Sequence, residues 1–545
     1  MRGLMMDRPL LISTILDHAA SVFHDREIVT RTVEGPIHRE TYADVANRSR
    51  QLANALTDLG IGQGDRVATI AWNTNRHVEL YFGVSGMGAV IHTINPRLHP
   101  TQMAFVINHA EARILCVDLT FAPLVTKLID QLPKVERVVY LTDRASMPAD
   151  ALDNGLCYED LLAAQSTNYP WPEFDENTAS ALCYTSGTTG DPKGVLYSHR
   201  ATVLHAFGFS LPSAVPMAES DAMLPVVPQF HVLAWGIPYA AAMNGTKLVM
   251  PGPGLDGASL TRLMRDEEVT ITAGVPTIWH GLLAHWRQTG ETVPSLKRII
   301  IGGSAAPRSM IEAFQEEFGI TVLHAWGMTE MSPLGTVSLL KAGMESADKD
   351  KRFGKLAKQG RAVYGVEMKI VDEHNRPLPH DGTAFGALKV RGPWIASGYY
   401  RLDHSEHHDA DGWFDTGDVA TMDDDAYMQI TDRKKDLIKS GGEWISSIDL
   451  ENVAMGHPAV AQAAVIGIPD EKWDERPLLA VVKAADATVD AEGIRAYLGE
   501  KVAKWWLPEK IVFVEALPIG ATGKVLKTKL RAAYADGSLT AEGGA

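Results

Sequence analysis

Short apolar runs alternate with longer amphipathic segments over roughly the first two thirds of the chain. The runs are rich in β-branched residues and are too short for helices, so they predict buried strands. They cover residues 66–72, 89–95, 113–118, 137–142, 180–185, 246–250, 269–275, 298–304 and 321–327. Amphipathic segments such as "TYADVANRSRQLANALTDLG" lie between them. Because this alternation is typical of parallel sheets covered by helices, the sequence predicts an α/β fold.

The pattern changes after about residue 360. Glycine, aspartate and short strands dominate through "GALKVRGPWIASGYY", which predicts a smaller β subdomain. A charged stretch, "TDRKKDLIKSGGEW", follows, and beyond it we expect a helix, two strands, another helix and a last strand. We therefore predict a large N-terminal domain, residues 1–433, and a small mobile α+β domain, residues 434–545.

Composition and charge narrow the classes of function. The chain has 545 residues, of which 46% are apolar, and its formal net charge is −16. This acidic balance argues against a nucleic-acid partner, because phosphate-backbone binders carry a basic face. Three separated cysteines argue against a disulfide framework or a zinc site and favour a cytoplasmic location. The longest apolar stretch is too short to span a bilayer, and residues 1–21 predict an amphipathic helix, not a signal peptide.

A loop rich in glycine and hydroxyl groups follows the strand expected at residues 180–185. It lies within "CYTSGTTGDPKGVLYSH", residues 183–199. Backbone N–H groups, hydroxyls and the Lys193 ammonium together suit a polyphosphate. The common phosphate loop needs its lysine directly after glycine, whereas Lys193 follows Pro192. Composition alone therefore leaves two readings, another type of phosphate loop and a solvated surface loop.

Five motifs in a fixed order resemble those of the adenylate-forming superfamily, which includes acyl-CoA synthetases, luciferases and peptide-synthetase adenylation domains. They are "YTSGTTGDPKG", "HAWGMTE" (324–330), "DGWFDTGD" (411–418), "TDRKKDLIKSGGEWIS" (431–446) and "LPIGATGKVLK" (517–527). The resemblance covers nearly the whole chain. It implies an acid–thiol ligase: a carboxylate attacks the α-phosphorus of ATP to give acyl-AMP and pyrophosphate, and coenzyme A then displaces AMP.

The resemblance also implies which residues bind the nucleotide. Glu330 would hold Mg²⁺ against the phosphates. Asp418 would accept hydrogen bonds from the ribose hydroxyls, supported by Arg433. The Trp326 ring replaces the tyrosine common in the family and would stack on adenine. The full set expected to bind ATP or AMP is Thr185, Ser186, Gly187, Thr188, Thr189, Gly190, Lys193, Trp326, Gly327, Thr329, Asp418 and Arg433.

The last two motifs imply a hinge and a catalytic lysine. Lys524 would bridge the carboxylate and the α-phosphate, whereas nearby Lys527 is interpreted as a surface lysine. Lys435 falls at the hinge position. Gly442 lies in the loop that would face the active site after rotation, with Lys439 and Glu443 as further candidates near the coenzyme A channel, although a charged surface loop would look the same. The residues expected to be catalytic are Lys524, His231, Glu330 and Lys193.

The acyl pocket is expected around "PQFHVLAWG". Trp235 follows His231 by four residues, which would place both on one face of a helix, and a plain core helix is the alternative. Gly302 and Gly303 would keep the backbone close to the substrate. Several runs resemble the medium-chain acyl-CoA synthetase branch, which includes 3-methylmercaptopropionate-CoA ligases. The resemblance therefore favours 3-(methylthio)propionate as the acid, with medium-chain fatty acids as the alternative.

Other functions stay open at this point. "GPGLDG" (252–257) follows an expected strand and resembles a dinucleotide-binding turn, so an NAD-dependent dehydrogenase is a distant alternative. The absence of an acidic residue at the end of the next expected strand argues against this alternative. Intact Lys193, Glu330, Asp418 and Lys524 argue against a non-catalytic relative. Because no carrier-like domain follows the last motif, free coenzyme A is preferred over a carrier protein. The chain could act as a monomer or a homodimer.

Overall fold

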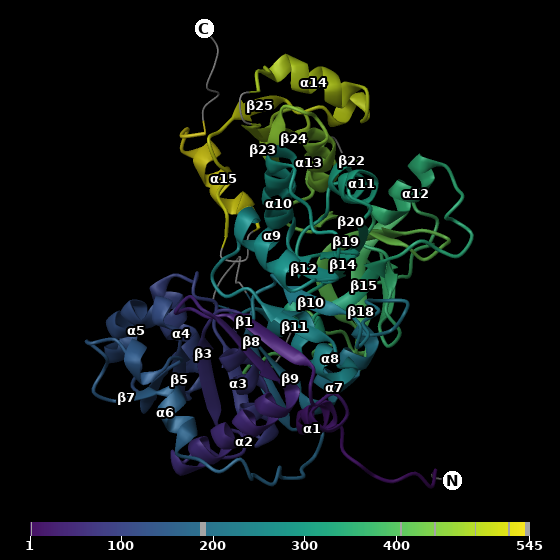
Figure 1. Cartoon of the computed structure of the whole chain (residues 1–545). Helices are drawn as coiled ribbons and strands as arrows, with labels where there is room; N and C mark the ends of the chain where they lie inside the picture. The colour runs from purple at the N-terminus through teal and green to yellow at the C-terminus, as the bar shows by residue number, and fades with distance from the viewer. Residues whose placement is uncertain are drawn as a thin grey trace.

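The computed structural model describes residues 1, 3–185, 192–403, 406–440, 443–484, 487–520 and 524–539 (Figure 1). The expected α/β architecture is confirmed, with two large sheets, a β subdomain and a small C-terminal α+β domain. Within the part of the chain that the structure describes, every helix is too short or too polar to cross a bilayer.

The first large sheet has seven strands in the order β7-β6-β5-β3-β4-β8-β9, and only β8 and β9 pair antiparallel. The strands are β3 (Arg66–Ile70), β4 (Val90–Thr93), β5 (Ala112–Val117), β6 (Arg137–Tyr140), β7 (Gly155–Cys157), β8 (Ala179–Tyr184) and β9 (Gly194–Ser198). The expected phosphate loop falls between β8 and β9 in the sequence. Because β9 is an edge strand, the residues that flank the expected loop lie at one edge of this sheet.

The second large sheet has nine strands in the order β16-β15-β14-β13-β12-β10-β11-β1-β2. The strands are β1 (Glu27–Arg31), β2 (Ile37–Thr41), β10 (Ala222–Pro225), β11 (Lys247–Met250), β12 (Ile271–Gly274), β13 (Arg298–Ile301), β14 (Thr321–Gly327), β15 (Leu334–Ser338) and β16 (Arg361–Ala362). Strands β1 and β10–β14 are parallel to their neighbours within that run.

Helices bury both faces of each large sheet. They are α1 (Ile12–Val22), α2 (Tyr42–Asp58), α3 (Asn75–Gly86), α4 (Pro100–Ala110), α5 (Ala122–Leu128), α6 (Tyr158–Ala163), α7 (His199–Phe209), α8 (Ile237–Asn244), α9 (Gly257–Asp266), α10 (Pro276–Thr289), α11 (Arg308–Glu312) and α12 (Lys349–Leu356). Along β13, Ile300 joins the core between the sheets, whereas Ile299 and Ile301 join the core beneath α9 and α10. This alternation is the reason why the strands read as uninterrupted apolar runs.

The N-terminal helix is shorter than the sequence predicts. It begins at Ile12, and residues 3–8 are exposed and not helical, whereas the amphipathic pattern predicts a helix over residues 1–21. Pro9 provides the reason, because its ring lacks a donor and disfavours the helical conformation of Arg8. Leu4, Met5 and Met6 consequently stay exposed.

The β subdomain predicted after about residue 360 is present. It is a four-stranded antiparallel sheet of β17 (Glu367–Val371), β18 (Phe385–Arg391), β19 (Phe414–Met422) and β20 (Met428–Arg433). β19 and β20 carry Asp418 and Arg433 directly opposite each other. The register between β19 and β20 thus places Asp418 next to Arg433, the two residues expected to bind the ribose.

The C-terminal unit forms its own sheet and cores (Figure 1, yellow-green). Its elements are β21 (Ile438–Ser440), β22 (Glu443–Ile445), α13 (Ser447–Met455), β23 (Val460–Asp470), β24 (Asp474–Lys483), α14 (Ala491–Gly499), β25 (Lys510–Phe513) and α15 (Lys527–Ala535). β20 ends at Arg433, and the next sheet begins at Ile438. The boundary at residues 433 and 434, and the mobility of the small domain, stay predictions.

Candidate active site

A cavity of about 1080 Å³ brings together most of the residues singled out in the sequence. Its walls come from both large sheets, the β subdomain and the small domain. The predicted residues that line it are Thr185, Lys193, His231, Trp235, Gly302, Gly303, Trp326, Gly327, Thr329, Glu330, Arg433, Lys435 and Lys524. Residues separated by more than 300 positions in the chain therefore share one chamber.

Two hydrogen bonds join the residues that flank the expected phosphate loop, Thr185 and Lys193. The Thr185 N–H donates to the Lys193 carbonyl at 2.9 Å, and the Lys193 N–H donates to the Thr185 hydroxyl at 3.2 Å. Both residues face the cavity. The predictions on Ser186, Gly187, Thr188, Thr189 and Gly190 fall outside the described residues.

An ion pair between a buried carboxylate, Asp418, and a partly exposed guanidinium, Arg433, marks the side of the cavity where the ribose is expected. Asp418 Oδ1 lies 2.7 Å from Arg433 Nε, and the Trp326 indole N–H donates to Asp418 Oδ2 at 3.2 Å. Burial raises the pKa of the Asp418 carboxyl, while the Arg433 guanidinium and the Lys524 ammonium oppose that shift. The indole bond shows that Trp326 does more than present a flat ring, because it also orients the carboxylate.

Lys524 projects into the cavity from a small hairpin. The Gly520 N–H donates to the Lys524 carbonyl at 2.7 Å, and the Leu526 N–H donates to the Pro518 carbonyl at 2.7 Å. The side chain is exposed to the cavity space, although protein surrounds it. Burial lowers its pKa to about 8, and the Arg433 charge acts in the same direction, opposed by Asp418 and Glu330.

His231 forms the neighbouring part of the wall and is neutral near pH 7. Burial lowers the pKa of its imidazole to about 4, and the positive charge of Lys524 lowers it further. A neutral imidazole can donate or accept one hydrogen bond without competing with Lys524 for an anion. The pair thus places one cation beside one uncharged polar group.

The prediction that His231 and Trp235 share a helix face is wrong. Residues 232–236 form a left-handed turn, with φ of 42° at Val232, 57° at Trp235 and 76° at Gly236. Such a turn costs about 1–2 kcal/mol at each residue other than glycine, so packing must impose it. A Cβ at Gly236 would lie 2.6 Å from His205 Nδ1, so only glycine admits that imidazole. Both His231 and Trp235 nevertheless line the cavity.

The Trp235 ring lies against the glycine pair at the end of β13. A Cβ at Gly302 would lie 2.9 Å from Trp235 Cη2 and 3.1 Å from the Ala325 carbonyl oxygen. Gly303 has a φ of +81°, which L-residues rarely adopt. The glycines thus let the indole form a flat apolar wall of the cavity.

Glu330 is buried and held by a residue that the sequence did not indicate. The Tyr399 hydroxyl donates to Glu330 Oε1 at 2.8 Å, and Tyr399 also lines the cavity. His407 was likewise missed, and its Nε2 lies 3.5 Å from Lys193 Nζ. Arg97, His99 and Gln102, at the start of α4, face the same space. None of these five residues lies in a motif, so only the fold brings them to the site.

The hinge candidates divide between the inside and the outside of the cavity. Lys435 lines it, and burial lowers the pKa of this lysine. Lys439 is not among the described lining residues, and its ammonium lies 5.0 Å from the centre of the Trp444 ring. Gly442 falls outside the described residues, as does the side chain of Glu443, whose backbone pairs with Ser440. Lys524 is therefore inside while Lys439 is outside.

Lys527 is not the surface lysine that the sequence suggested. Its side chain is 13% exposed and its Nζ lies 2.8 Å from Glu451 Oε1. It also donates to the Ser447 hydroxyl at 2.5 Å. This ion pair ties the first turn of α15 to α13 and so stiffens the support of the hairpin that carries Lys524.

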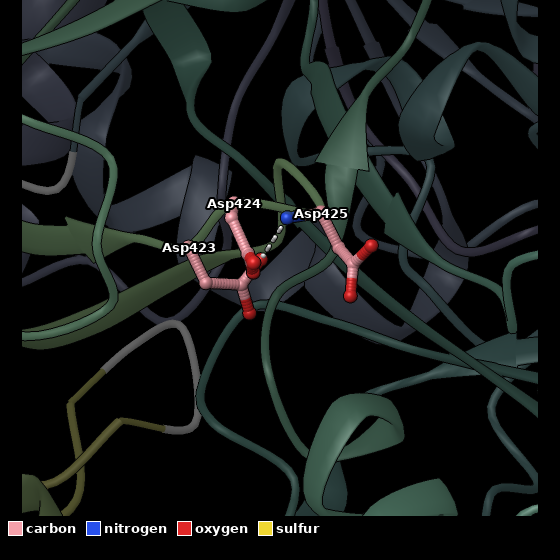
Figure 2. A group of neighbouring side chains, drawn as sticks. All are labelled: Asp423, Asp424 and Asp425. Atoms are coloured by element: carbon pink, nitrogen blue, oxygen red, sulfur yellow. Dashed lines mark hydrogen bonds between the residues drawn. The ribbon is translucent and has the colours of Figure 1, made fainter.

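A cluster of three aspartates could hold a metal ion by its geometry, but lysine side chains already pair with it. Asp423, Asp424 and Asp425 gather at the turn after β19 (Figure 2). Lys355 and Lys358 lie 2.8 Å and 2.6 Å from Asp423 Oδ2, so lysines already neutralise the cluster.

The "GPGLDG" turn (252–257), which resembles a dinucleotide-binding turn, is in contact with Arg31 of β1. Arg31 donates from Nη1 to the Gly254 carbonyl at 3.4 Å and from Nη2 to the Ser259 carbonyl at 2.9 Å. A Cβ at Gly252 would meet the Arg31 carbonyl oxygen at 2.3 Å. These glycines thus serve the close approach of β1 and do not need a dinucleotide to explain them.

Comparison with known proteins places the same regions in one group of enzymes. Residues 16–400 match the family described as AMP-binding enzyme, and residues 449–524 match the AMP-binding enzyme C-terminal domain. The chain is 51% identical to 3-methylmercaptopropionyl-CoA ligase of Ruegeria pomeroyi, covering 98% of this chain and 99% of that protein. It is 48% identical to medium-chain-fatty-acid–CoA ligase of Ectopseudomonas oleovorans, covering 98% of each. The crystal structure of the anthranilate CoA ligase AuaEII in complex with anthranoyl-AMP superposes with a TM-score of 0.87 at 26% identity, covering 98% of this chain and 99% of that chain.

Proposed function

The chain belongs to the AMP-binding enzyme family and is an ATP-dependent acyl-CoA ligase, and from that premise we propose that its acid is 3-(methylthio)propionate. The reaction converts a carboxylic acid, ATP and coenzyme A into acyl-CoA, AMP and pyrophosphate. The observation that supports this mechanism best is the single cavity shared by Lys193, Glu330 and Lys524 beside the Asp418–Arg433 pair. A medium-chain fatty acid is the second candidate, supported by the 48% identity to a medium-chain ligase.

The proposed first step is the attack of the carboxylate on the α-phosphorus of ATP. Lys524 would lie between the two anions and offset the negative charge that both bring together. Asp418 would accept hydrogen bonds from the ribose hydroxyls and so fix the distance between the nucleotide and Lys524. The acyl chain would extend toward Trp235, whose flat ring suits a thioether as well as methylene groups.

Glu330 fits a magnesium ion that accompanies ATP. The carboxylate accepts one hydrogen bond from Tyr399, which leaves further lone pairs on its two oxygens. Oxygen ligands are those that magnesium prefers, and it binds nucleotide sites through one or two carboxylates and phosphates. When bound, the ion would neutralise negative charge on the phosphate oxygens.

The proposed second step needs the space that Lys524 occupies. A thiol must reach the acyl carbon of acyl-AMP, and AMP then leaves. We propose that the small domain turns about Lys435, which withdraws Lys524 and brings the loop around Gly442 to the cavity. The position of Lys524 inside and Lys439 outside supports the assignment of the present arrangement to the first step.

Turnover is expected to depend strictly on the acid. AMP and pyrophosphate should form only when ATP, Mg²⁺ and a carboxylic acid are present, and thioester only when coenzyme A is added. A panel of acids from acetate to laurate, including 3-(methylthio)propionate, measured by AMP release and acyl-CoA formation, tests this. The highest kcat/KM should fall on 3-(methylthio)propionate. Release of ADP and orthophosphate in place of AMP would refute adenylation, and a maximum at octanoate or laurate would refute the proposed acid.

Trp235→Ala is expected to change the preference among acids. Removing the indole opens the wall beside Gly302, so longer acids should gain relative to short ones, by roughly 1–3 kcal/mol in specificity. The measurement is kcat/KM for each acid of the panel in the wild type and in the variant. Trp279, a fully buried core residue of α10, offers a matched control, because Trp279→Phe should lower stability without changing the order of the acids. An unchanged order in Trp235→Ala would make Trp235 a core residue only.

The location of the protein is a separate proposal. The three cysteines are free and buried. Thiols persist in a reducing compartment, which supports the cytoplasm.

A further inference from the structure

The lysine of the phosphate loop has an aromatic and basic surrounding that no motif describes. Lys193 Nζ lies 3.5 Å from His407 Nε2 and 5.0 Å from the centre of the Tyr399 ring. All three side chains line the cavity. Tyr399 in turn donates to Glu330 at 2.8 Å, so this corner joins the loop lysine to the proposed magnesium ligand. The corner contains Lys193, His407, Tyr399 and Glu330, and we refer to it as the Lys193 corner.

The backbone directs His407 toward the Lys193 corner. The His407 carbonyl accepts a hydrogen bond from the Asp415 N–H at 2.6 Å, and the next residue, His408, forms a β-bridge with Phe414. His408 Nε2 is bonded to the Ala396 carbonyl at 2.7 Å, and His408 is not among the described residues that line the cavity. The rings of His407 and His408 both pack on Phe414, with centroids at 5.9 Å and 5.1 Å. Two adjacent histidines thus share one packing partner, and His407 is the one that faces Lys193.

Within the Lys193 corner, Lys193 and His407 together have the composition of an anion site. The ammonium and the imidazole can both donate to phosphate oxygens, and hydrogen bonds to charged groups are the strong ones. The distal phosphates of ATP concentrate negative charge, and hydrogen bonds from both groups would offset it. In the structure the imidazole nitrogen is within reach of the ammonium, so a phosphate oxygen could be shared between the two groups with little movement.

We infer that His407 binds the distal phosphates of ATP together with Lys193 and so holds the pyrophosphate that leaves in the first step. This inference rests on the proposed adenylation mechanism, because it adds a phosphate ligand to that reaction. Pyrophosphate is released only in the first step and takes no part when supplied acyl-AMP reacts with coenzyme A. The two half-reactions therefore separate a phosphate contact from a general structural role.

The experiment compares His407→Ala with His408→Ala in the full-length enzyme. His407→Ala should lower kcat/KM for ATP in acid-dependent ATP–pyrophosphate exchange by roughly tenfold to thirtyfold, as the loss of one hydrogen bond to a charged group does. Inhibition by pyrophosphate should weaken by a similar factor, whereas inhibition by AMP and thioester formation from supplied acyl-AMP should stay within about twofold. His408→Ala should leave the ATP and pyrophosphate constants at the wild-type values.

A double variant tests whether His407 acts with Lys193. If both groups bind the same phosphate, the loss of transition-state stabilisation in the double variant should differ from the sum of the losses in Lys193→Ala and His407→Ala. Residues in contact show such non-additivity. Unchanged ATP and pyrophosphate constants in His407→Ala would overturn the inference, and so would equal losses in both half-reactions or the same losses in His408→Ala. Absence of acid-dependent exchange in the wild type would instead overturn the proposed function, and the inference with it.

Discussion

Replacement of Lys524 by alanine is expected to slow adenylation on the order of 10²-fold or more, as loss of a group that stabilises transition-state charge does. The small domain places Lys524 in the cavity, where its ammonium interacts electrostatically with Asp418 and Glu330. Its task ends once acyl-AMP has formed, so thioester formation from supplied acyl-AMP should remain within a few-fold of the wild-type rate. The measurement is each half-reaction on its own, with ATP–pyrophosphate exchange for the first and acyl-CoA formation for the second.

A matched lysine separates this effect from a general loss of charge. Lys501 is an exposed lysine of the same domain, and its ammonium lies 4.9 Å from the centre of the Tyr497 ring, away from the described lining of the cavity. Lys501→Ala should therefore leave both half-reactions unchanged. Equal losses of both half-reactions in Lys524→Ala would show that Lys524 only supports the domain structure.

Replacement of Lys435 by proline is expected to produce the reverse pattern. β20 ends at Arg433 and β21 begins at Ile438, so Lys435 lies in the short connection between the two sheets. A proline ring locks φ near −65° and also restricts Lys434, which hinders a large turn of the backbone. Thioester formation should fall on the order of 10²-fold, equal to about 2.7 kcal/mol of added barrier, while adenylation is largely retained.

The control for this variant is Lys435→Ala. Alanine removes the same ammonium from the cavity wall but leaves the backbone free to turn. If the hinge mechanism is right, Lys435→Ala should retain most of the thioester rate that Lys435→Pro loses. The same loss in both variants would assign the effect to the side chain and would contradict a turn about this residue.

The α/β alternation could be predicted because the strands are buried on both faces. The run at residues 321–327 coincides with β14, and the run at 298–304 contains β13 with the two glycines just beyond it. Sheet order could not be predicted, because the nine-stranded sheet joins β1 to β11 across more than 200 residues. The left-handed turn at 232–236 could not be predicted either, since valine and tryptophan do not favour positive φ.

Some residues of the candidate site could be predicted from the sequence, whereas others could not. Lys193, Glu330, Asp418 and Lys524 were predicted because each lies in a short ordered motif. Their assigned roles stay predictions. Tyr399 and His407 carry no local signal, because only the fold brings them against Glu330 and Lys193. The prediction that Lys527 is a surface lysine is wrong for a similar reason, because its ion-pair partner, Glu451, lies 76 positions earlier in the chain.

The central claim is that a carboxylate oxygen attacks the α-phosphorus of ATP in this cavity, and one isotope measurement tests it directly. The acid is supplied with ¹⁸O in both carboxylate oxygens, together with ATP and coenzyme A, and the products are analysed by mass spectrometry. The bond formed joins one labelled oxygen to the α-phosphorus, and the thiol later breaks the bond between that oxygen and the acyl carbon. AMP should therefore carry one ¹⁸O for each acyl-CoA formed, and pyrophosphate should carry none. Unlabelled AMP, or ¹⁸O in released orthophosphate, would contradict the acyl-adenylate and with it the roles proposed for Lys524 and Lys435.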